Sequence, residues 1–287
     1  MNPVSSWLVS ILAGVAVSAA WGISGGAEAR WLTIASWNMS NFGNAESDCP
    51  PERLQKIATI LTSDDVDVIA LQEVLCVCGR TPSASSCLDQ LVDELTRQAQ
   101  PDGGDWRCLD VEPSPADGRQ EHYAFLYRAD KMRLVEPHGA IPGSPGDPFA
   151  GRPPGYACFQ TLDGTYDFLL ATYHAPSPNY DPKDDLHRLG EAWGPFLTES
   201  PRQVDAFLAG DFNVGVKVRG ESLPELAAFV DGGTTWAGQP YDTILAAPGA
   251  GWRRFTGWAQ SDSRTIAEKG DHALVWASFW IAFAGNR

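Results

Sequence analysis

The stretch Val204-Asp205-Ala206-Phe207-Leu208-Ala209-Gly210-Asp211-Phe212-Asn213 joins a short apolar segment to a polar end. Residues 204–208 have the length and apolar content of a strand that is buried in a sheet. Asp211 and Asn213 follow this strand directly. A single carboxylate in such a place is more often a turn former or a helix cap than a functional group. The stretch matters because the same arrangement recurs along the chain.

Five other predicted strands also have polar side chains at one end. They are Asn38 after 32–37, Glu73 after 66–71, His174 after 165–173, Asp242 at the start of 242–245, and Asp271 with His272 before 273–281. Turn formation does not easily account for six such places. Their carboxylate and amide oxygens are hard ligands, which suit Mg²⁺ or Ca²⁺ better than zinc. The two histidines offer acid–base chemistry near neutral pH, so the pattern predicts a site that combines a cation with proton transfer.

The rest of the chain alternates between strand and helix patterns. Apolar residues recur at helical spacing over 51–61, behind Ser86 and over 185–197, and Ser222 with Glu225 predicts a capping box that opens a further helix. Residues 123–127 read as another strand, and the stretch 137–155, rich in Pro and Gly, reads as a loop within the same domain. Mixed strands with helices outside them predict an α+β fold in which two sheets pack face to face.

The composition is that of a globular protein. The chain has 287 residues, of which 44% are hydrophobic and 20% are charged, and these values exclude a disordered or coiled-coil chain. The formal net charge of −15 excludes a non-specific phosphate binder of the usual basic kind. An acidic protein still binds phosphate where a bound cation neutralises the negative charges of the protein and the phosphate.

We expect residues 1–29 to be a secretory signal peptide and residues 30–287 to be one folded domain. Residues 4–23 form a mostly apolar run, and Ala27-Glu28-Ala29 supplies a small-x-small cleavage pattern. The alternative is a retained N-terminal anchor, because no Lys or Arg precedes the run. Cleavage predicts a secreted or periplasmic protein with no membrane span in the mature chain.

Cysteine usage agrees with an oxidising compartment. All six cysteines fall in the predicted mature chain, at Cys49, Cys76, Cys78, Cys87, Cys108 and Cys158. An even count suits disulfides. A metal knuckle at Cys76-Val77-Cys78 is the alternative, but no second Cys-x-Cys or His pair accompanies it. We therefore expect the six cysteines to be bridged, in one of the 15 pairings that six cysteines allow.

The polar strand ends, taken in order, carry a family resemblance. The series is Asn38, Leu71-Gln72-Glu73-Val74, Tyr173-His174-Ala175-Pro176, Gly210-Asp211-Phe212-Asn213, Tyr241-Asp242-Thr243-Ile244 and Asp271-His272. It resembles the endonuclease/exonuclease/phosphatase superfamily, and within it the deoxyribonuclease I family, over residues 37–272. The resemblance implies a four-layered α/β sandwich and a divalent-cation-dependent hydrolase that acts on phosphate ester bonds.

The resemblance also implies which residues hold the cation and the phosphate. Glu73, with Asn38 and Asp271 near it, would hold Mg²⁺, or else Ca²⁺ or Mn²⁺, on the scissile phosphate. Asp211 and Asn213 would orient the attacking water, the phosphate or a second cation. Asn38 would also lie near the phosphate. Arg152 stands where the nuclease family carries a phosphate-binding arginine.

Two histidine–carboxylate pairs complete the implied catalytic residues. His272, oriented by Asp242, would be one member of an acid–base pair, and His174, oriented by Glu121, would be the other. Phosphodiester hydrolysis needs charge neutralised on the non-bridging oxygens, an activated water and a protonated or metal-bound leaving oxygen. The implied residues supply all three requirements.

Departures from the nuclease pattern bear on the substrate. Leu75 and Arg119 replace an arginine and a tyrosine with which deoxyribonuclease I contacts DNA. The resemblance therefore implies the catalytic residues more strongly than it implies the contacts with DNA. Arg80, Arg119, Arg128 and Arg152 either line a groove for an anionic substrate or form salt bridges. The resulting prediction is a secreted endonuclease that hydrolyses DNA and has no stable protein partner. The alternatives are a phosphatase, a lipid phosphodiesterase resembling sphingomyelinase, and an inactive binding protein of the same fold.

Overall fold

The computed structural model describes residues 30–43, 49–79, 86–100, 104–112, 121–143, 149, 152–176, 181–199, 205–229, 234–235, 237–246, 259–262 and 272–281. The predicted signal peptide, residues 1–29, lies outside the described residues and stays a prediction. None of the described helices has an apolar stretch long enough to span a bilayer.

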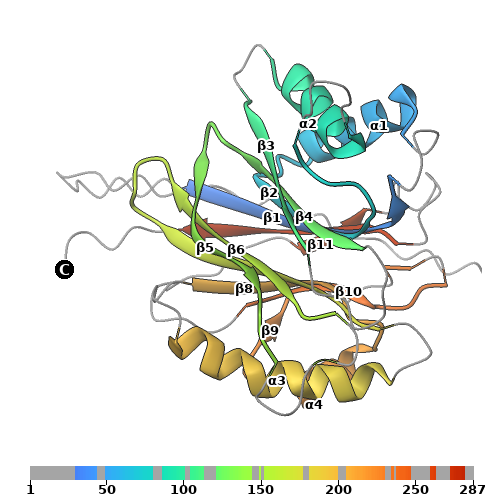
Figure 1. Cartoon of the computed structure of the whole chain (residues 1–287), viewed down its shortest axis with the longest axis vertical. Helices are drawn as coiled ribbons and strands as arrows, with labels where there is room; N and C mark the ends of the chain where they lie inside the picture. Colours follow the sequence, from blue (N-terminus) through green and yellow to red (C-terminus); the bar gives the residue numbers. More distant parts are fainter. Residues whose placement is uncertain are drawn as a thin grey trace, which may run out of the picture.

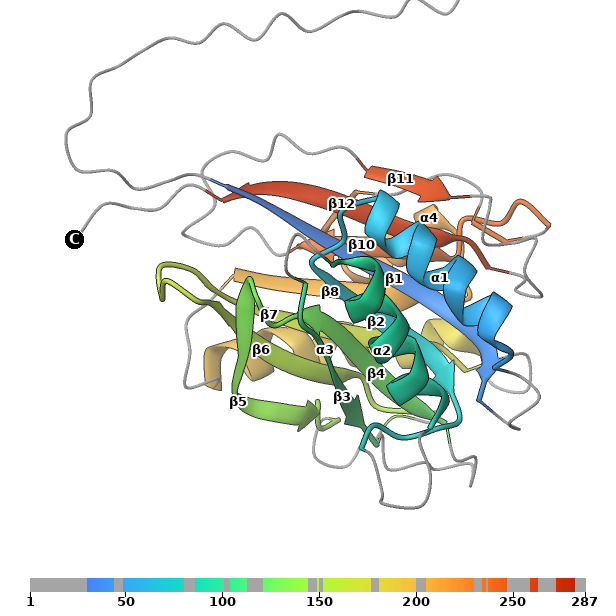
Figure 2. The same ribbon diagram turned by 90° about the horizontal axis from the view of Figure 1, so that it is seen from above.

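Within these described ranges, two six-stranded sheets pack face to face (Figures 1 and 2). The first has the order β11-β12-β1-β2-β4-β3, with β1 (Arg30–Phe42), β2 (Val68–Val74), β3 (Trp106–Val111), β4 (His122–Arg128), β11 (Ala259–Asp262) and β12 (Leu274–Ile281). The second has the order β5-β6-β7-β8-β10-β9, with β5 (Met132–Ala140), β6 (Gly155–Thr161), β7 (Asp167–His174), β8 (Asp205–Asp211), β9 (Ala227–Ala228) and β10 (Asp242–Ala246).

The described residues include four helices, which form the outer layers. The helices α1 (Pro51–Ser63) and α2 (Cys87–Gln98) cover the first sheet, and α3 (Pro182–Glu199) and α4 (Val216–Ser222) lie on the far side of the second (Figure 1). Ser86 caps α2 through a capping box with Asp89. The four-layered α/β sandwich that the sequence predicts is therefore confirmed.

Strand periodicity explains the layers. In β4, Tyr123 and Phe125 belong to the core between the two sheets, whereas Ala124 and Leu126 belong to the core beneath α1 and α2. Successive side chains of a strand point to opposite faces, so a strand covered on both faces is apolar throughout. A third core fills the space between the second sheet and α3. This double burial is why the site-bearing strands read as continuous apolar runs.

Parallel pairing brings the polar strand ends together. β1 runs parallel to β2, with Asn38 opposite Gln72, and β7 runs parallel to β8, with His174 opposite Asp211. Parallel neighbours end at the same edge of a sheet. β10 is antiparallel to β8 and begins at that edge, with Asp242 opposite Asp211. The ends of both sheets thus meet on one side of the sandwich.

Two local predictions are wrong. The predicted loop 137–155 begins inside β5, which continues to Ala140 and pairs with β6. Ser222 does not cap a following helix, because it is the last residue of α4. Pro224 explains that ending, since the residue before a proline disfavours helical geometry, and Leu223 has φ −127° and ψ 59°. A turn leads from there to β9.

The expectation that all six cysteines are bridged is also wrong. Two disulfides are present, Cys49–Cys87 and Cys78–Cys108. Cys76 packs against the core beneath α1 and α2, whereas Cys158 is buried in the core beneath α3. Because both sheets lie between these two cores, Cys76 and Cys158 cannot reach each other.

Candidate active site

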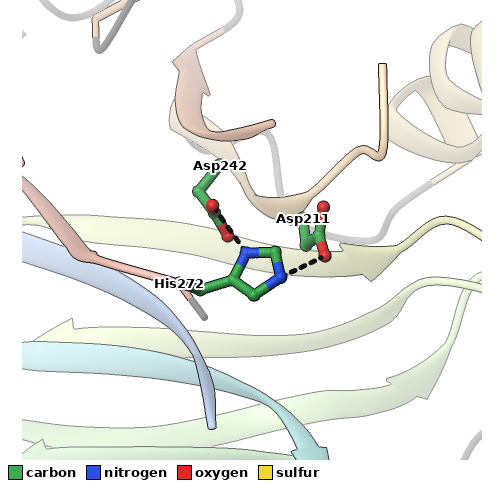
Figure 3. Close-up of side chains that lie close together, drawn as sticks. All are labelled: Asp211, Asp242 and His272. Carbon is green, nitrogen blue, oxygen red and sulfur yellow. Dashed lines mark hydrogen bonds and ion pairs between the residues drawn. The ribbon is translucent and has the colours of Figure 1, made fainter. Parts of the chain in front are cut away.

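Asp211, at the end of β8, is the centre of the polar cluster. Its Oδ2 accepts a hydrogen bond from Asn38 Nδ2 at 3.1 Å and lies 3.5 Å from His272 Nε2 and 3.8 Å from His174 Nε2. Figure 3 shows the His272 ring between Asp211 and Asp242. Asp211 is 1% exposed. Its carboxylate therefore meets groups from both sheets in a space that is nearly closed to water.

Backbone geometry explains the Gly-Asp-Phe-Asn sequence around Asp211. Gly210 has φ +147°, and a Cβ placed there would lie 1.9 Å from the carbonyl oxygen of Tyr173, so no other residue fits between β7 and β8. Asn213 has φ +49°, its backbone N–H donates to Asp211 Oδ1 at 2.9 Å, and its Nδ2 donates to the Ala175 carbonyl at 3.1 Å. Asn213 thus fixes the Asp211 carboxylate and the segment after His174.

Glu73 faces Asp211 from the first sheet. It has φ +53°, in the left-handed region that costs a non-glycine residue conformational energy. Asn38 Nδ2 donates to Glu73 Oε1 at 3.0 Å, and the backbone N–H of Asn41 donates to Oε2 at 3.0 Å. Asn38 Oδ1 accepts from the backbone N–H of Ser40 at 3.0 Å. In this orientation the amide of Asn38 bridges two carboxylates and turns its oxygen toward the backbone.

Glu121 and Arg152 surround the ring of His174. The Nδ1 of His174 lies 2.6 Å from Glu121 Oε1, and Arg152 Nη1 lies 2.7 Å from Glu121 Oε2. Burial by itself would lower the pKa of His174, but the hydrogen bond and charge of Glu121, together with Asp211, raise it. Burial opposes ionisation of Glu121, yet the contacts with His174 and Arg152 hold its pKa below the ordinary value.

Asp242 supports the second histidine. Its Oδ2 lies 2.8 Å from His272 Nδ1 and accepts from the hydroxyl of Thr234 at 2.8 Å. Trp37 Nε1 donates to the His272 carbonyl at 3.2 Å. Burial, assisted by the charge of Asp211, raises the pKa of Asp242. The ring of His272 is thereby held with Nε2 directed at Asp211.

The charges and donor atoms of the cluster fit a hard divalent cation. Glu73, Glu121, Asp211 and Asp242 carry four carboxylates, and Arg152 is a single guanidinium, so three negative charges remain when both imidazoles are neutral and two remain when His174 is protonated. Buried charge of one sign is costly without a counter-ion. Ligand atoms of Asp211, Asp242 and His272 lie within 4.8 Å of one another, although Asp242 Oδ2 and His272 Nδ1 already pair with each other at 2.8 Å. Carboxylate oxygens are the donors that Mg²⁺ and Ca²⁺ prefer.

Most of the predicted site residues lie in this cluster. Those brought together are Asn38, Glu73, Glu121, Arg152, His174, Asp211, Asn213, Asp242 and His272. Asp271, Arg80 and Arg119 lie outside the described residues. Arg128 is not near the site, because it ends the seven-residue strand β4, roughly 20 Å from Glu121 at the usual rise per residue. It forms a salt bridge with Asp130 at 2.7 Å instead.

Two supporting residues, Tyr123 and Thr234, were not among the predicted site residues. The hydroxyl of Tyr123 accepts a hydrogen bond from the backbone N–H of His174 at 3.1 Å, but its strand position made Tyr123 look like an ordinary core residue. Thr234 supports Asp242 from a segment with no strand or helix pattern. The one usable signal was the position of Tyr123, two residues after Glu121.

Comparisons with known proteins agree with this geometry. The sequence matches the Endonuclease/Exonuclease/phosphatase family over residues 35–286. A search of curated proteins gave no match to this sequence.

Solved structures share the fold. An endonuclease/exonuclease/phosphatase family protein from Bacteroides thetaiotaomicron has a TM-score of 0.63 and 19% identity, covering 89% of this chain and 100% of its own. A mannosyl-6-phosphatase from the same organism has a TM-score of 0.57 and 19% identity, covering 86% and 98%. The human Nocturnin catalytic domain with bound sulfate has a TM-score of 0.57 and 11% identity, covering 88% and 98%.

At these identities the structural likeness shows a shared fold, whereas the family match covers most of the chain. Endonucleases, exonucleases and phosphatases all hydrolyse phosphate ester bonds. This chain belongs to the endonuclease/exonuclease/phosphatase family of phosphate ester hydrolases.

Proposed function

We propose that the protein is a secreted, divalent-cation-dependent phosphodiesterase that cleaves DNA as an endonuclease. The observation that carries the proposal is the pair of imidazoles at Asp211. His174 Nε2 and His272 Nε2 both lie within 3.8 Å of Asp211 Oδ2, and each ring has a carboxylate on its Nδ1. Two oriented imidazoles are what a hydrolysis needs when one group accepts a proton from water and another donates a proton to the leaving oxygen.

The two histidines have different environments, which supports different roles. Glu121 raises the pKa of His174, so His174 is suited to carry a proton at neutral pH and to donate it to the leaving oxygen. His272 is oriented by Asp242 and accepts the proton of the attacking water. Asp211, between the two rings, aligns the water and stabilises whichever imidazole is charged.

Glu73 would hold the divalent cation, together with Asp271, which precedes His272 in the sequence. When bound, such a cation neutralises the non-bridging phosphate oxygens as a Lewis acid. Asn38 keeps the Glu73 carboxylate in place by donating to its Oε1. Asn41 fixes the other oxygen through its backbone N–H. Asn213 orients Asp211 in the same way.

Charge favours a diester over a monoester as the substrate. A phosphate monoester carries between one and two negative charges at neutral pH, roughly −1.5 to −2, whereas a diester carries one. Among the described residues of the site, the only fixed cation is Arg152, and it is already paired with Glu121 at 2.7 Å. A cluster with excess carboxylates repels a dianion more strongly than a monoanion. The sequence resemblance to deoxyribonuclease I supports DNA as the diester.

The proposal is tested with the purified protein on four substrates with and without EDTA. These are supercoiled plasmid, bis(p-nitrophenyl) phosphate, p-nitrophenyl phosphate and sphingomyelin vesicles. Plasmid nicking that requires Mg²⁺ and is lost in His272→Ala, but not in the exposed control His187→Ala, supports the proposal. Hydrolysis of the monoester alone contradicts a diesterase, and hydrolysis of sphingomyelin alone contradicts a nuclease. No turnover of any substrate favours an inactive binding protein.

A further inference from the structure

Arg152 lies in the wall of the site rather than at its opening. The side chain is 3% exposed, and its Nη1 lies 2.7 Å from Glu121 Oε2. A phosphate oxygen that bound to the Nη1 hydrogen directed at Glu121 would have to take the place of that carboxylate, and 3% exposure leaves little surface at the other N–H groups of Arg152. This geometry differs from the phosphate-binding role that the family resemblance implies for Arg152.

Arg152 also reaches the ring of His174. Its Nη2 lies 2.9 Å from His174 Nδ1, and the same ring nitrogen lies 2.6 Å from Glu121 Oε1. One imidazole nitrogen either donates or accepts, but not both at once. The shorter contact is the charge-assisted one to Glu121, so Nδ1 donates to Glu121 and Arg152 acts through its pair with that carboxylate.

The pairing gives Glu121 a fixed charge and a fixed orientation. The Glu121 side chain is 6% exposed, and a buried carboxylate without a partner is costly. Glu121 Oε1 also accepts from the backbone N–H of Glu73 at 3.2 Å. Arg152 therefore stabilises a carboxylate that contacts both His174 and the segment of Glu73.

We propose that Arg152 is a positioning residue, which orients His174 through Glu121, and that it does not bind phosphate. The proposal rests on the proposed function, because it assigns a task within that reaction. A phosphate-binding arginine and a positioning arginine are distinguished by which kinetic parameter their replacement changes. An arginine that binds phosphate in the ground state contributes to the affinity for substrate and for free phosphate, whereas a positioning arginine contributes to turnover and leaves both affinities unchanged.

The test compares the wild type with Arg152→Lys and Arg152→Met on bis(p-nitrophenyl) phosphate. We expect kcat to fall roughly 10–100-fold in Arg152→Met, as for other residues that orient a catalytic group. Arg152→Lys keeps the charge but loses the planar guanidinium, so its kcat should lie between that of the wild type and that of Arg152→Met. KM, and the affinity for inorganic phosphate measured by calorimetry, should stay within about threefold of the wild type if Arg152 does not touch phosphate.

Loss of folding is separated from loss of positioning by a double variant. Arg152→Met leaves the buried Glu121 without its guanidinium partner, whereas Arg152→Met/Glu121→Gln removes both charges of that pair. The double variant should recover thermal stability without recovering kcat. Arg188→Met is the matched control, because Arg188 pairs with the fully buried Asp185 at 2.8 Å on α3, away from the site. It should lower the thermal midpoint and leave kcat unchanged.

The outcomes for Arg152 and for the proposed function are distinguishable. A tenfold or larger loss of phosphate affinity in Arg152→Lys, with kcat unchanged, would overturn the positioning role. Recovery of wild-type kcat in the double variant would overturn it as well. A wild type without diesterase activity would overturn the proposed function instead, and the calorimetric comparison would still decide whether Arg152 binds phosphate, because phosphate binding needs no turnover.

Discussion

Asn38 on β1 donates a hydrogen bond to Asp211 on β8 at 3.1 Å, and this contact joins the two sheets at the site. The same Nδ2 donates to Glu73 at 3.0 Å. One neutral side chain thus lies between two carboxylates that repel each other. Asn38 is fully buried, so water does not replace it readily. The spacing of the carboxylates in the absence of a cation depends on this amide.

Replacement of Asn38 by alanine should destabilise the protein. The buried carboxylate of Asp211 and the half-buried carboxylate of Glu73 each lose a donor, and an unsatisfied buried group costs about 1–3 kcal/mol. Urea unfolding in EDTA measures the loss, and added Mg²⁺ should reverse part of it, because a cation between the carboxylates offsets their repulsion. The exposed Gln55→Ala on α1 is the control. Equal loss in EDTA and in Mg²⁺ would mean that Asn38 does not act through the carboxylates.

Glu73→Gln should remove cation affinity while the fold persists. The amide keeps the shape of the side chain and one oxygen that accepts from Asn38 or from the backbone N–H of Asn41, but it neutralises none of the cation's charge. We expect turnover to fall by orders of magnitude and the thermal midpoint in EDTA to change little. Calorimetric titration with Mg²⁺ measures the affinity, with the exposed Glu191→Gln on α3 as control. Full activity of Glu73→Gln in millimolar Mg²⁺ would remove Glu73 from the site.

His174→Ala and His272→Ala should separate proton transfer from cation binding. Each change should lower diester cleavage roughly 10²–10⁴-fold, while calorimetric cation affinity stays near the wild-type value. The double variant should lose far less than the product of the single losses, because the two groups act in one reaction. His187→Ala on α3, where the side chain is 73% exposed, should behave as the wild type. Lost cation binding in either single variant would make that histidine a ligand.

The site residues that could be placed from the sequence pattern alone are those at the ends of buried strands. Asp211 and His174 could be placed at one edge because parallel strands end together. The resemblance placed Arg152 in the site, but its pairing with Glu121 could not be predicted, since a loop residue has no periodicity to fix its direction. Likewise, the separation of Cys76 from Cys158 depends on which face of each sheet they occupy. Sequence spacing does not contain that long-range information.

The pH dependence should report the contact between Glu121 and His174. Burial by itself lowers the pKa of His174, but the contact with Glu121 and the charge of Asp211 together raise it by more. The pKa in the folded protein therefore lies above the ordinary 6.5. Glu121→Gln loses the raising contact and keeps the burial, so the alkaline limb of the pH–kcat profile should move to lower pH. Pre-steady-state cleavage of bis(p-nitrophenyl) phosphate across pH 5–9 measures it. A limb that stays in place would mean that His174 is not the proton donor.

The same pair contributes to stability in a defined pH window. Because the folded pKa of His174 is raised, its contribution is fully present below the unfolded value of 6.5 and is lost as pH rises through the folded pKa. Urea unfolding of the wild type should therefore show this loss above about pH 6.5. The variant Glu121→Gln/Arg152→Met should not show it. An equal decline in the two proteins would assign the pH dependence to other groups.

Thiol counting should give two thiols in each chain. Cys76 and Cys158 take part in neither disulfide, and burial raises the pKa of the Cys76 thiol to about 11. At pH 8 the Cys76 thiol is therefore protonated, and the native protein should react slowly with Ellman's reagent, since the thiolate is the reactive form. In denaturant without reductant two thiols should react, and Cys76→Ser should reduce this number to one. Reduction of either disulfide should cost about 2–5 kcal/mol of stability. No reactive thiol in the denatured, unreduced protein would mean that all six cysteines are bridged.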